Sequence, residues 1–180
     1  MAHNLSVGPT GKPEMMYAGE TPWHGLGTRL PADVTSAEAI KAAGLDWQVD
    51  KLPAYFKGPG GAILPAEDSF LTVRRDSLKA LGMVGPRYEV LQNGQAFSCF
   101  DAVVGLKAAM YHTAGALGDG EIVWILAKLP GYVRVIGDDI TEKYLLLSNR
   151  HDGSGSVKIL FTPIRVVCQN TLNIALHGAV

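Results

Sequence analysis

Cysteine is scarce in this sequence, and long apolar runs are missing. The two cysteines, Cys99 and Cys168, lack the paired spacing of a zinc site or a disulfide framework. No stretch reaches the roughly 18 apolar residues that a membrane-spanning helix needs, and the N-terminus carries no basic-then-apolar signal peptide. We therefore expect a reduced protein that resides in the cytoplasm.

An excess of positive charge is also missing from the chain as a whole. The formal net charge is −1, which excludes a bulk polycation that coats nucleic acid but leaves room for a local basic groove. From Lys143 onward, however, four basic residues accompany a single acidic residue, Asp152, so this segment carries +3. Positive charge is therefore displaced toward the C-terminal part of the chain.

Recognisable catalytic motifs are absent as well. The sequence has no H-E-x-x-H or C-x-x-C spacing, no G-x-S-x-G elbow and no Walker lysine. The pair His151-Asp152 can be read as a base with its orienting group, but an Asp-Gly step in a hairpin is chiefly turn chemistry. A metal-dependent nuclease built on Asp138, Asp139 and His151 is the weakest hypothesis. We expect no enzymatic activity, no metal and no cofactor.

The segment from Lys143 to Ala175 gives the clearest structural signal. Residues 144–149 and 156–161 read as two strands around a Gly/Ser-rich turn, which predicts a hairpin. Thr162-Pro163 is typical of a helix N-terminus, and apolar residues then recur at helical spacing as far as Leu176. The opposite face of this predicted helix presents side chains that can donate hydrogen bonds: Arg165, Gln169, Asn170 and Asn173.

The remaining patterns predict an α+β fold. Residues 1–20 read as a flexible N-terminal arm, and residues 21–180 as a single domain. A capping box at Thr35–Glu38 and a cap at Asn93 each begin a helix, residues 53–68 read as a loop with a hairpin turn at the Gly58 cluster, and residues 70–74 and 87–91 read as strands. Short strands at 110–117, 121–129, 132–136 and 144–149 follow one another, which predicts a curved antiparallel meander. We expect the helices that begin at Asn93 and Pro163 to cover one face of it.

Basic residues at strand ends and on the hairpin suggest a nucleic-acid groove. Tyr88 and Tyr144 are interleaved with them, and a basic track with stacking platforms is what single-strand binding requires. The other reading is that these charges only solvate strand ends, and the sequence leaves both readings open. The basic set is Arg74, Arg75, Lys79, Arg87, Arg150, Lys158 and Arg165.

Four segments together resemble a known family. They are Pro22-Trp23-His24-Gly25-Leu26-Gly27, residues 87–93, His151-Asp152-Gly153-Ser154 and the run from Pro163 to Leu172. This combination is similar to the phage/plasmid-like protein family, whose members are carried by bacteriophages, plasmids and actinobacterial genomes. Members of that family usually continue beyond this last segment, so we expect that a C-terminal continuation is missing after Val180.

The resemblance implies a mobile-element context, and a fold-level analogy extends it to phage single-strand annealing proteins. Such proteins form rings that hold single-stranded DNA in an outer basic groove and anneal it without a nucleotide cofactor. We therefore expect a homo-oligomeric, non-enzymatic protein that binds and anneals single-stranded DNA. Arg165 and Lys158 would contact phosphates, and the groove would be extended by Arg150, Arg74, Arg75 and Arg87.

Two points stay open at this level. Gln169, Asn170 and Asn173 either supply hydrogen bonds to DNA or are interior polar groups that fix the helix on the sheet. The alternative function is a phage protein that binds and inhibits a host defence protein or a signalling molecule through its glycine-rich loops.

Overall fold

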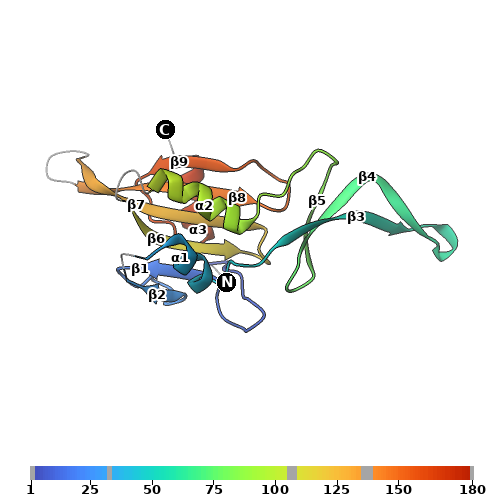
Figure 1. Ribbon diagram of the computed structural model, residues 1–180, viewed down its shortest axis with the longest axis horizontal. Helices are drawn as coiled ribbons and strands as arrows, with labels where there is room; N and C mark the ends of the chain where they lie inside the picture. Colours follow the sequence, from blue (N-terminus) through green and yellow to red (C-terminus); the bar gives the residue numbers. More distant parts are fainter. Residues whose placement is uncertain (1–2, 32–33, 105–108, 135–139, 179–180) are drawn as a thin grey trace.

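The computed structural model describes residues 3–31, 34–104, 109–134 and 140–178. These residues form two β-sheets, and helices pack on the larger one (Figure 1). In chain order the elements are β1 (Met15–Ala18), β2 (Thr28–Leu30), α1 (Ser36–Ala42), β3 (Val49–Lys57), β4 (Ile63–Arg74), β5 (Lys79–Val84), α2 (Asn93–Val104), β6 (Met110–Leu117), β7 (Ile122–Arg134), β8 (Ile140–Arg150), β9 (Lys158–Thr162) and α3 (Gln169–His177), with a short 3-10 turn at Pro59–Gly61. The α+β class is confirmed.

The larger sheet contains the predicted meander. Its strand order is β2-β1-β6-β7-β8-β9, and β6 to β9 pair antiparallel with their sequence neighbours. The hairpin of β8 and β9 is confirmed, with Tyr144 opposite Thr162 and Ser148 opposite Lys158. On the far side of the meander, β1 pairs antiparallel with β6, and β2 runs parallel to β1. The turn after β8 and the edge strand β9 therefore lie at one side of the sheet.

Both faces of this sheet are covered, which differs from the expected packing on one face. Along β7, Val123 and Ile125 point into a core that includes α1 and α2. The intervening Trp124 and Leu126 point into a second core that includes α3. A strand that is apolar at successive positions must be buried on both sides, and α3 supplies the second cover.

The third helix begins later than the sequence pattern predicts. It starts at Gln169 instead of Pro163, because the preceding backbone bonds to the sheet and to side chains. The hydroxyl of Thr113 donates to the carbonyl of Val166 at 2.6 Å, and the backbone N–H groups of Val167 and Cys168 donate to Thr171 Oγ1. Residues 163–168 therefore form a non-helical segment that contacts the sheet, and Arg165 lies on it and not on the helix.

The N-terminal segment, expected to be a flexible arm, is part of the sheet. Met15 and Met16 on β1 are fully buried, one in each core. The backbone N–H of Ser6 also donates to the carbonyl of Ala116 at 2.8 Å, so the chain pairs with β6 well before β1 begins. Burial of successive residues in two different cores fixes this segment in place. The Gly/Pro-rich composition of the segment gives no indication of that burial.

Two strand boundaries also differ from the prediction. Residues 87–91 form no strand and instead cross from the smaller sheet to α2. Pro130 and Gly131 do not end a strand, because β7 continues through them with a bulge between Lys128 and Tyr132. Bulges accept proline and glycine without ending the pairing. The predicted strand at 132–136 extends beyond the described residues after Arg134.

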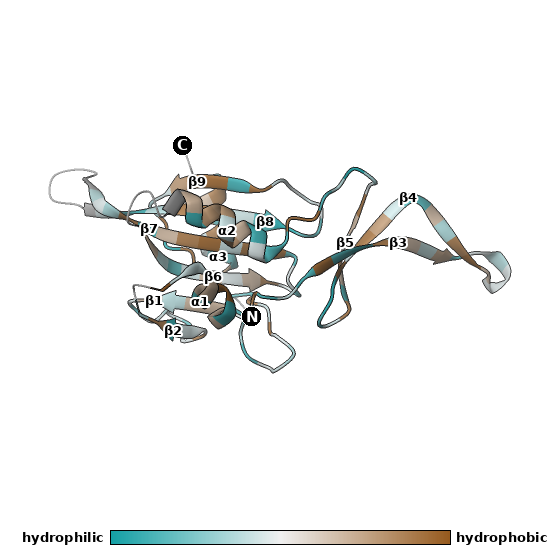
Figure 2. Ribbon diagram, viewed as in Figure 1, coloured by the Kyte–Doolittle hydropathy of each residue, from teal (hydrophilic) through white to brown (hydrophobic). Residues whose placement is uncertain are grey.

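The smaller sheet projects from the body as an arm, defined here as β3, β4 and β5 (Figure 1). Residues 53–68, expected to be a loop, mostly extend β3 and β4 into a long antiparallel ribbon. The predicted turn at the Gly58 cluster is confirmed, since the Gly58 N–H donates to the carbonyl of Ala62 at 2.8 Å. Apolar residues alternate with hydrophilic ones along both strands of the ribbon (Figure 2).

The base of the arm packs against the turn that follows β8. Gly82 on β5 lies so close to Asp152 that a Cβ at this position would overlap the Asp152 backbone. A Cβ at Gly153 would likewise overlap Val84. The His151-Asp152-Gly153 turn therefore forms the joint between the main sheet and the arm. In the described residues, no helix is both long and apolar enough to cross a membrane.

Candidate functional site

The structure separates the nine residues that the sequence suggested for DNA binding. One is buried, two lie at the base of the arm, and the others lie on β8, on β9 and on the α3 side of the main sheet. The buried residue is Arg74, and the two at the base of the arm are Arg75 and Arg87. Arg150 lies on β8 and Lys158 on β9, and the residues on the α3 side of the sheet are Arg165, Gln169, Asn170 and Asn173.

Arg74 cannot contact DNA, which corrects its predicted role. Its side chain is 2% exposed, and its guanidinium donates to the carboxylates of Glu14 and Asp76. It also lies over the Trp47 ring at 4.3 Å from the centroid. Burial disfavours the charged form, but the hydrogen bonds to Glu14 and Asp76 outweigh it and hold the pKa of Arg74 above its ordinary value. Arg74 therefore ties the end of β4 to the segment before β1.

Its neighbour Arg75 is exposed at the base of the arm. The guanidinium Nε donates to Asp50 Oδ2 at 2.9 Å, and this pairing raises the pKa of Arg75 and lowers that of Asp50. The next residue on β3, Lys51, donates through Nζ to the carbonyls of Pro86 at 2.6 Å and Tyr88 at 2.9 Å. These contacts bring the loop that carries Arg87 beside β3.

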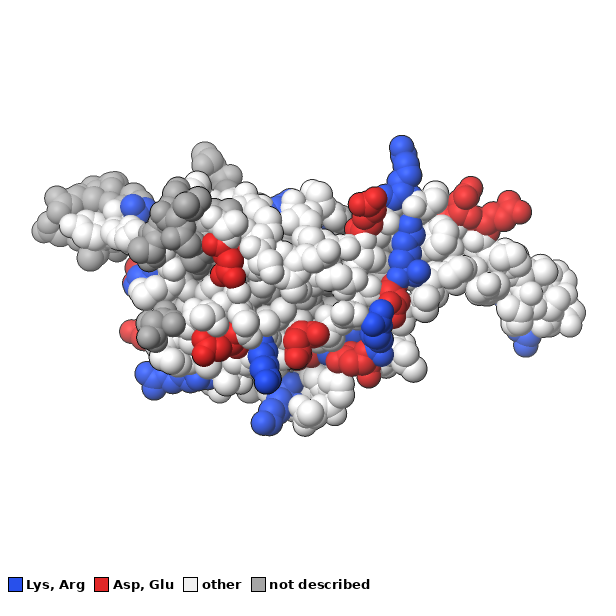
Figure 3. Space-filling view, in the orientation of Figure 1, with Lys and Arg blue, Asp and Glu red and all other residues white. Residues whose placement is uncertain are grey.

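We call Lys51, Arg75 and Arg87 the basic column. Figure 3 shows Lys and Arg side chains in a column across the base of the arm, with acidic side chains beside it. Arg75 has a carboxylate partner in Asp50, whereas the hydrogen bonds of Lys51 within the described part of the chain go to carbonyl oxygens, and its Nζ lies 4.6 Å from the centroid of the Phe70 ring. Arg87 is exposed and makes no hydrogen bond or ion pair with any described residue. Positive charge is therefore in local excess here.

Arg150 lies at the rim between the basic column and the main sheet. The Tyr88 hydroxyl donates to the carbonyl of Arg150 at 2.9 Å, which places the Arg87 loop against the end of β8. Burial, with a contribution from the charge of Asp152, raises the pKa of Tyr88. The Arg150 guanidinium donates to Ser154 and lies 3.7 Å from Asp152. Its charge is thus partly balanced.

Lys158 and the amide residues lie on the α3 side of the sheet. Lys158 on β9 is exposed and sits opposite Ser148, on the face where Leu146 and Leu160 pack toward α3. On α3, Gln169 donates to Asn173 Oδ1 at 2.9 Å. Because Asn170 and Asn173 are exposed and Gln169 is only partly buried, these residues do not fix the helix on the sheet from its interior.

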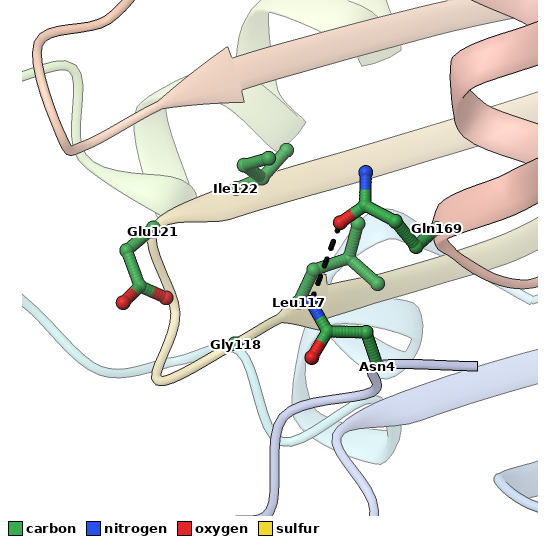
Figure 4. Close-up of a pocket in the computed structure, with 6 residues that line it drawn as sticks. All are labelled: Asn4, Leu117, Gly118, Glu121, Ile122 and Gln169. Atoms are coloured by element: carbon green, nitrogen blue, oxygen red, sulfur yellow. Dashed lines mark hydrogen bonds between the residues drawn. The ribbon is translucent and has the colours of Figure 1, made fainter. Parts of the chain in front are cut away.

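A small hollow lies at the start of α3 (Figure 4). Its volume is about 200 Å³, and the amide of Asn4 donates to Gln169 Oε1 at 3.4 Å on one side of it. Ligand pockets usually measure roughly 300–1,000 Å³, so this hollow is small for a substrate. The residues that line it are Asn4, Leu117, Gly118, Glu121, Ile122 and Gln169.

Arg165 is largely occupied by contacts within the chain. Its Nη2 donates to the carbonyls of Glu20 at 2.6 Å and Ala18 at 3.3 Å, and its buried Nε finds no hydrogen-bond partner among the residues that the structure describes. Nearby, burial and then the positive charge of Arg165 lower the pKa of His112 to about 4. The ring of His112 stacks on Tyr144 at 5.2 Å. Arg165 therefore holds the turn after β1 on the sheet, which makes it a poor phosphate ligand.

His151 has a structural role, which favours the reading of the His151-Asp152 pair as part of a turn over the reading as a base with its orienting group. It is fully buried, its Nε2 lies 2.9 Å from Asn93 Oδ1, and its ring lies 5.5 Å from that of Trp47. Burial lowers the pKa of His151 to about 4, despite the opposing charge of Asp152. Asn93 in turn donates to the carbonyl of Leu45, so its side chain ties α2 to the joint and does not cap the helix.

Metal chemistry finds no support in the described part of the chain. There, no group of three or more His, Cys, Asp or Glu side chains is placed to hold a metal ion. Asp138 and Asp139, which the weakest hypothesis used, lie outside the described residues, and His151 is enclosed in the joint.

The sequence reasoning missed Lys51 and the exposed apolar end of the arm. Lys51 lies in a stretch where polar and apolar residues alternate around Trp47 and Val49, a pattern that indicates a strand and gives no sign of a binding site. The apolar residues on both sides of the Gly58 cluster were a usable signal, because apolar residues that flank a hairpin turn symmetrically indicate paired strands. The end of the ribbon carries Tyr55, Phe56, Ile63 and Leu64.

Comparisons with known proteins give a family and no function. A search of curated proteins and a search of solved structures found no match. A family model described as a domain of unknown function, DUF932, matches residues 80–180, which is more than half of the chain. The matched region begins in β5 and includes the Arg87 loop, the four-stranded meander and α3. The chain therefore belongs to the DUF932 family.

Proposed function

We propose that this protein binds single-stranded DNA and anneals complementary strands, as a homo-oligomer and without a nucleotide cofactor. It would act in the cytoplasm of a bacterium that carries a phage or plasmid, and it would have no enzymatic activity of its own. The observation that supports this proposal best is the basic column, where, among the described residues, Arg87 has no hydrogen-bond or ion-pair partner and Lys51 has no carboxylate partner. A phosphate backbone that crosses the base of the arm would meet both charges.

The surroundings of the basic column suit a single strand better than a duplex. Phe70 lies beneath Lys51 and Tyr88 is half-buried beside Arg87, so aromatic surface accompanies the charge. Stacking of bases on aromatic side chains requires unpaired bases, and it tolerates any sequence. Arg150, which lies between the basic column and the main sheet, would extend this basic surface, and Lys158 would continue it on the α3 side of the sheet. Gln169, Asn170 and Asn173 remain candidates for hydrogen bonds there.

Substitution of Arg87 tests the basic column, and it should leave the fold intact because Arg87 is exposed. We expect Arg87→Ala to weaken binding to a fluorescent single-stranded oligonucleotide, measured by anisotropy at several salt concentrations. The loss of one phosphate contact should make the slope of log K against log salt shallower by about 0.7. Addition of Arg150→Ala should weaken binding further.

Arg29→Ala is the matched control, because Arg29 is an exposed arginine on β2, at the opposite edge of the sheet. It should bind like the unaltered protein. If Arg87→Ala and the double variant also bind like the unaltered protein, with the same salt slope, the basic column does not carry DNA binding.

A second function rests on the exposed apolar end of the arm. Tyr55 and Ile63 are 62% and 68% exposed, and a surface of this kind fits a protein partner such as a host defence protein. The mass of the purified protein separates the two proposals. An oligomer of many subunits favours annealing, and a monomer or dimer that ignores DNA favours the inhibitor.

A further inference from the structure

The loop between β1 and β2 presents a tryptophan to solvent. We call residues 22–27 the Trp23 loop, and the proposed function gives this segment no role. Trp23 is 68% exposed, whereas the other two tryptophans of the chain, Trp47 and Trp124, are 7% and 0% exposed. A single exposed apolar residue needs no explanation by itself, so the surroundings of Trp23 decide its role.

Hydrogen bonds fix this loop without help from the indole. The Gly25 N–H donates to the carbonyl of Pro22 at 2.9 Å, which closes a turn with the tryptophan at its corner. His24 Nδ1 accepts the N–H of Leu26 at 3.1 Å, so its Nε2 carries the proton and donates to the carbonyl of Val167 at 3.0 Å. A turn corner of this kind accepts most residue types, so the fold does not require an indole here.

The indole stands beside two imidazole rings. The centroids of the Trp23 and His24 rings are 5.2 Å apart with an angle of 70° between their planes, and the His3 ring lies 5.7 Å from that of His24. Burial and, to a lesser extent, the neighbouring His24 lower the pKa of His3, so His3 is uncharged at neutral pH. The three rings therefore form an aromatic surface on which most of the indole stays open.

These rings lie beside amide side chains at the start of α3. The carbonyl of His3 accepts the N–H of Gln169 at 3.1 Å, and Asn4 donates to Gln169 Oε1 at 3.4 Å (Figure 4). One turn further along the helix, Asn173 accepts from Gln169 through Oδ1, and its Nδ2 makes no hydrogen bond with any described residue. Asn170 is exposed, and its side chain likewise has no hydrogen-bond partner within the described part of the chain. Aromatic surface and free amide groups are therefore adjacent.

Flat aromatic surface beside free amide groups suits an unpaired nucleobase. A base offers a π-face that stacks on aromatic side chains and an edge of hydrogen-bond donors and acceptors that amides can match. A purely apolar partner would bury the amides without hydrogen-bond partners, which costs free energy. In a duplex the base faces are stacked on one another and the pairing edges are occupied, so only an unpaired base can make both contacts.

We propose that the Trp23 loop and the exposed side of α3 bind one unpaired base of single-stranded DNA. The base stacks on Trp23, and Asn170 and Asn173 bond to its edge. This inference deepens the proposed function, because it rests on single-strand binding and adds a base contact to the phosphate contacts of the basic column. Lys158 lies on the same side of the sheet, so a strand that passes from the basic column to Lys158 continues toward this site.

Intrinsic fluorescence reports on this site almost alone. Because Trp47 and Trp124 are buried, a base in solution can stack only on Trp23. We expect single-stranded oligothymidine to quench the emission of the unaltered protein, and a duplex of the same length to leave it unchanged. Trp23→Phe keeps an aromatic platform but removes the reporter, so the quenching should disappear in that variant while binding largely persists.

Affinity gives an independent test. Trp23→Ala should weaken binding of a labelled single-stranded oligonucleotide, measured by anisotropy, roughly 5- to 150-fold, the range for loss of one stacked base. The slope of log K against log salt should stay the same, because no phosphate contact is lost, whereas Arg87→Ala makes it shallower. Tyr132→Ala, which removes an aromatic residue that is 56% exposed on β7, is the matched control and should bind like the unaltered protein. Circular dichroism should show all variants folded.

The results separate this inference from the proposed function. Single-strand binding with full affinity in Trp23→Ala would overturn the inference, leave the proposed function standing and point to a protein partner for the exposed indole. Weaker binding with a shallower salt slope in Trp23→Ala, or quenching by the duplex as strong as by the single strand, would also overturn it. If the unaltered protein binds no single strands at all, the proposed function is refuted and this inference with it.

Discussion

The main sheet and the arm both contain apolar strands, but the apolar side chains are buried in the main sheet and exposed at the end of the arm. In the main sheet, the side chains at successive positions of β7 are buried on both faces by α1, α2 and α3. In the arm, Tyr55, Phe56 and Ile63 are more than half exposed. Apolar residues that a chain leaves uncovered at the end of a projecting ribbon indicate a partner surface. The apolar residues of the two regions therefore differ in exposure: those of the main sheet contribute to stability, and those at the end of the arm face solvent.

The joint between these regions shows the same contrast between two adjacent residues. Arg74 points into the body and is 2% exposed, whereas Arg75 points out and its side chain is 59% exposed. The first residue attaches the arm, and the second contributes charge to its surface. Substitutions at the joint, in the main sheet and at the exposed end of the arm should therefore have very different effects on stability.

The largest effect is expected at the joint. Arg74→Ala leaves the carboxylate of Glu14 buried without its partner, and loss of one member of a buried pair usually costs about 3–5 kcal/mol. Urea unfolding measures this free energy. Arg75→Ala, which removes an exposed pair, should lower the free energy of unfolding far less. Equal costs for the two substitutions would mean that the arm is not attached through Arg74.

The next effect is expected in the main sheet. Gly115 on β6 lies beneath Trp124, and a Cβ at this position would overlap the indole ring. We expect Gly115→Ala to destabilise the protein by roughly 1–3 kcal/mol, the usual cost of overpacking. Thermal unfolding gives the shift in melting temperature. An unchanged melting temperature would show that this face of the sheet is more loosely packed than described.

A smaller, pH-dependent effect is expected from His151. Its pKa of about 4 in the folded protein lies below the unfolded value near 6.5, so the unfolded chain binds the proton first as pH falls. His151 therefore supports stability fully above pH 6.5, and that support is lost as pH falls from 6.5 to 4. His151→Gln should flatten the dependence of unfolding free energy on pH in this window by up to about 1.4 kcal/mol per pH unit. Urea unfolding at several pH values tests this, and an unchanged slope would assign the dependence to other groups.

The smallest effect on stability is expected at the exposed end of the arm. Phe56 is 51% exposed and contacts no core cluster, so Phe56→Ser should change the unfolding free energy of the monomer by less than about 0.5 kcal/mol. Unfolding at a protein concentration low enough to dissociate any oligomer measures this. A larger loss would mean that the end of the arm stabilises its own chain, and the contrast between the two regions would fail.

The sequence predicted the elements whose signals are local. The β8–β9 hairpin, the capping box at Thr35 and the turn at Gly58 all depend on neighbours within a few residues, and all three are confirmed. The predicted start of α3 was wrong because Thr113, distant in sequence, bonds to the Val166 carbonyl and holds that segment out of the helix. Local propensity cannot report such a contact.

The candidate site was predictable only in part, for the same reason. Arg74 and Arg75 are indistinguishable in the sequence, and only the fold reveals that Glu14 and Trp47 enclose the first of them. Arg87 was identified from its charge alone. Lys51 was missed because its proximity to the Arg87 loop depends on contacts with the carbonyls of Pro86 and Tyr88, 35 and 37 residues away in the chain.

One measurement tests the central claim most directly. Two complementary oligonucleotides that carry a donor and an acceptor dye are mixed with the protein, without nucleotide or metal, and energy transfer is followed over time. We predict that the protein accelerates annealing, that Arg87→Ala reduces the acceleration, and that Arg29→Ala does not. An annealing rate equal to that of the oligonucleotides alone, at protein concentrations that saturate single-strand binding, would contradict the annealing function.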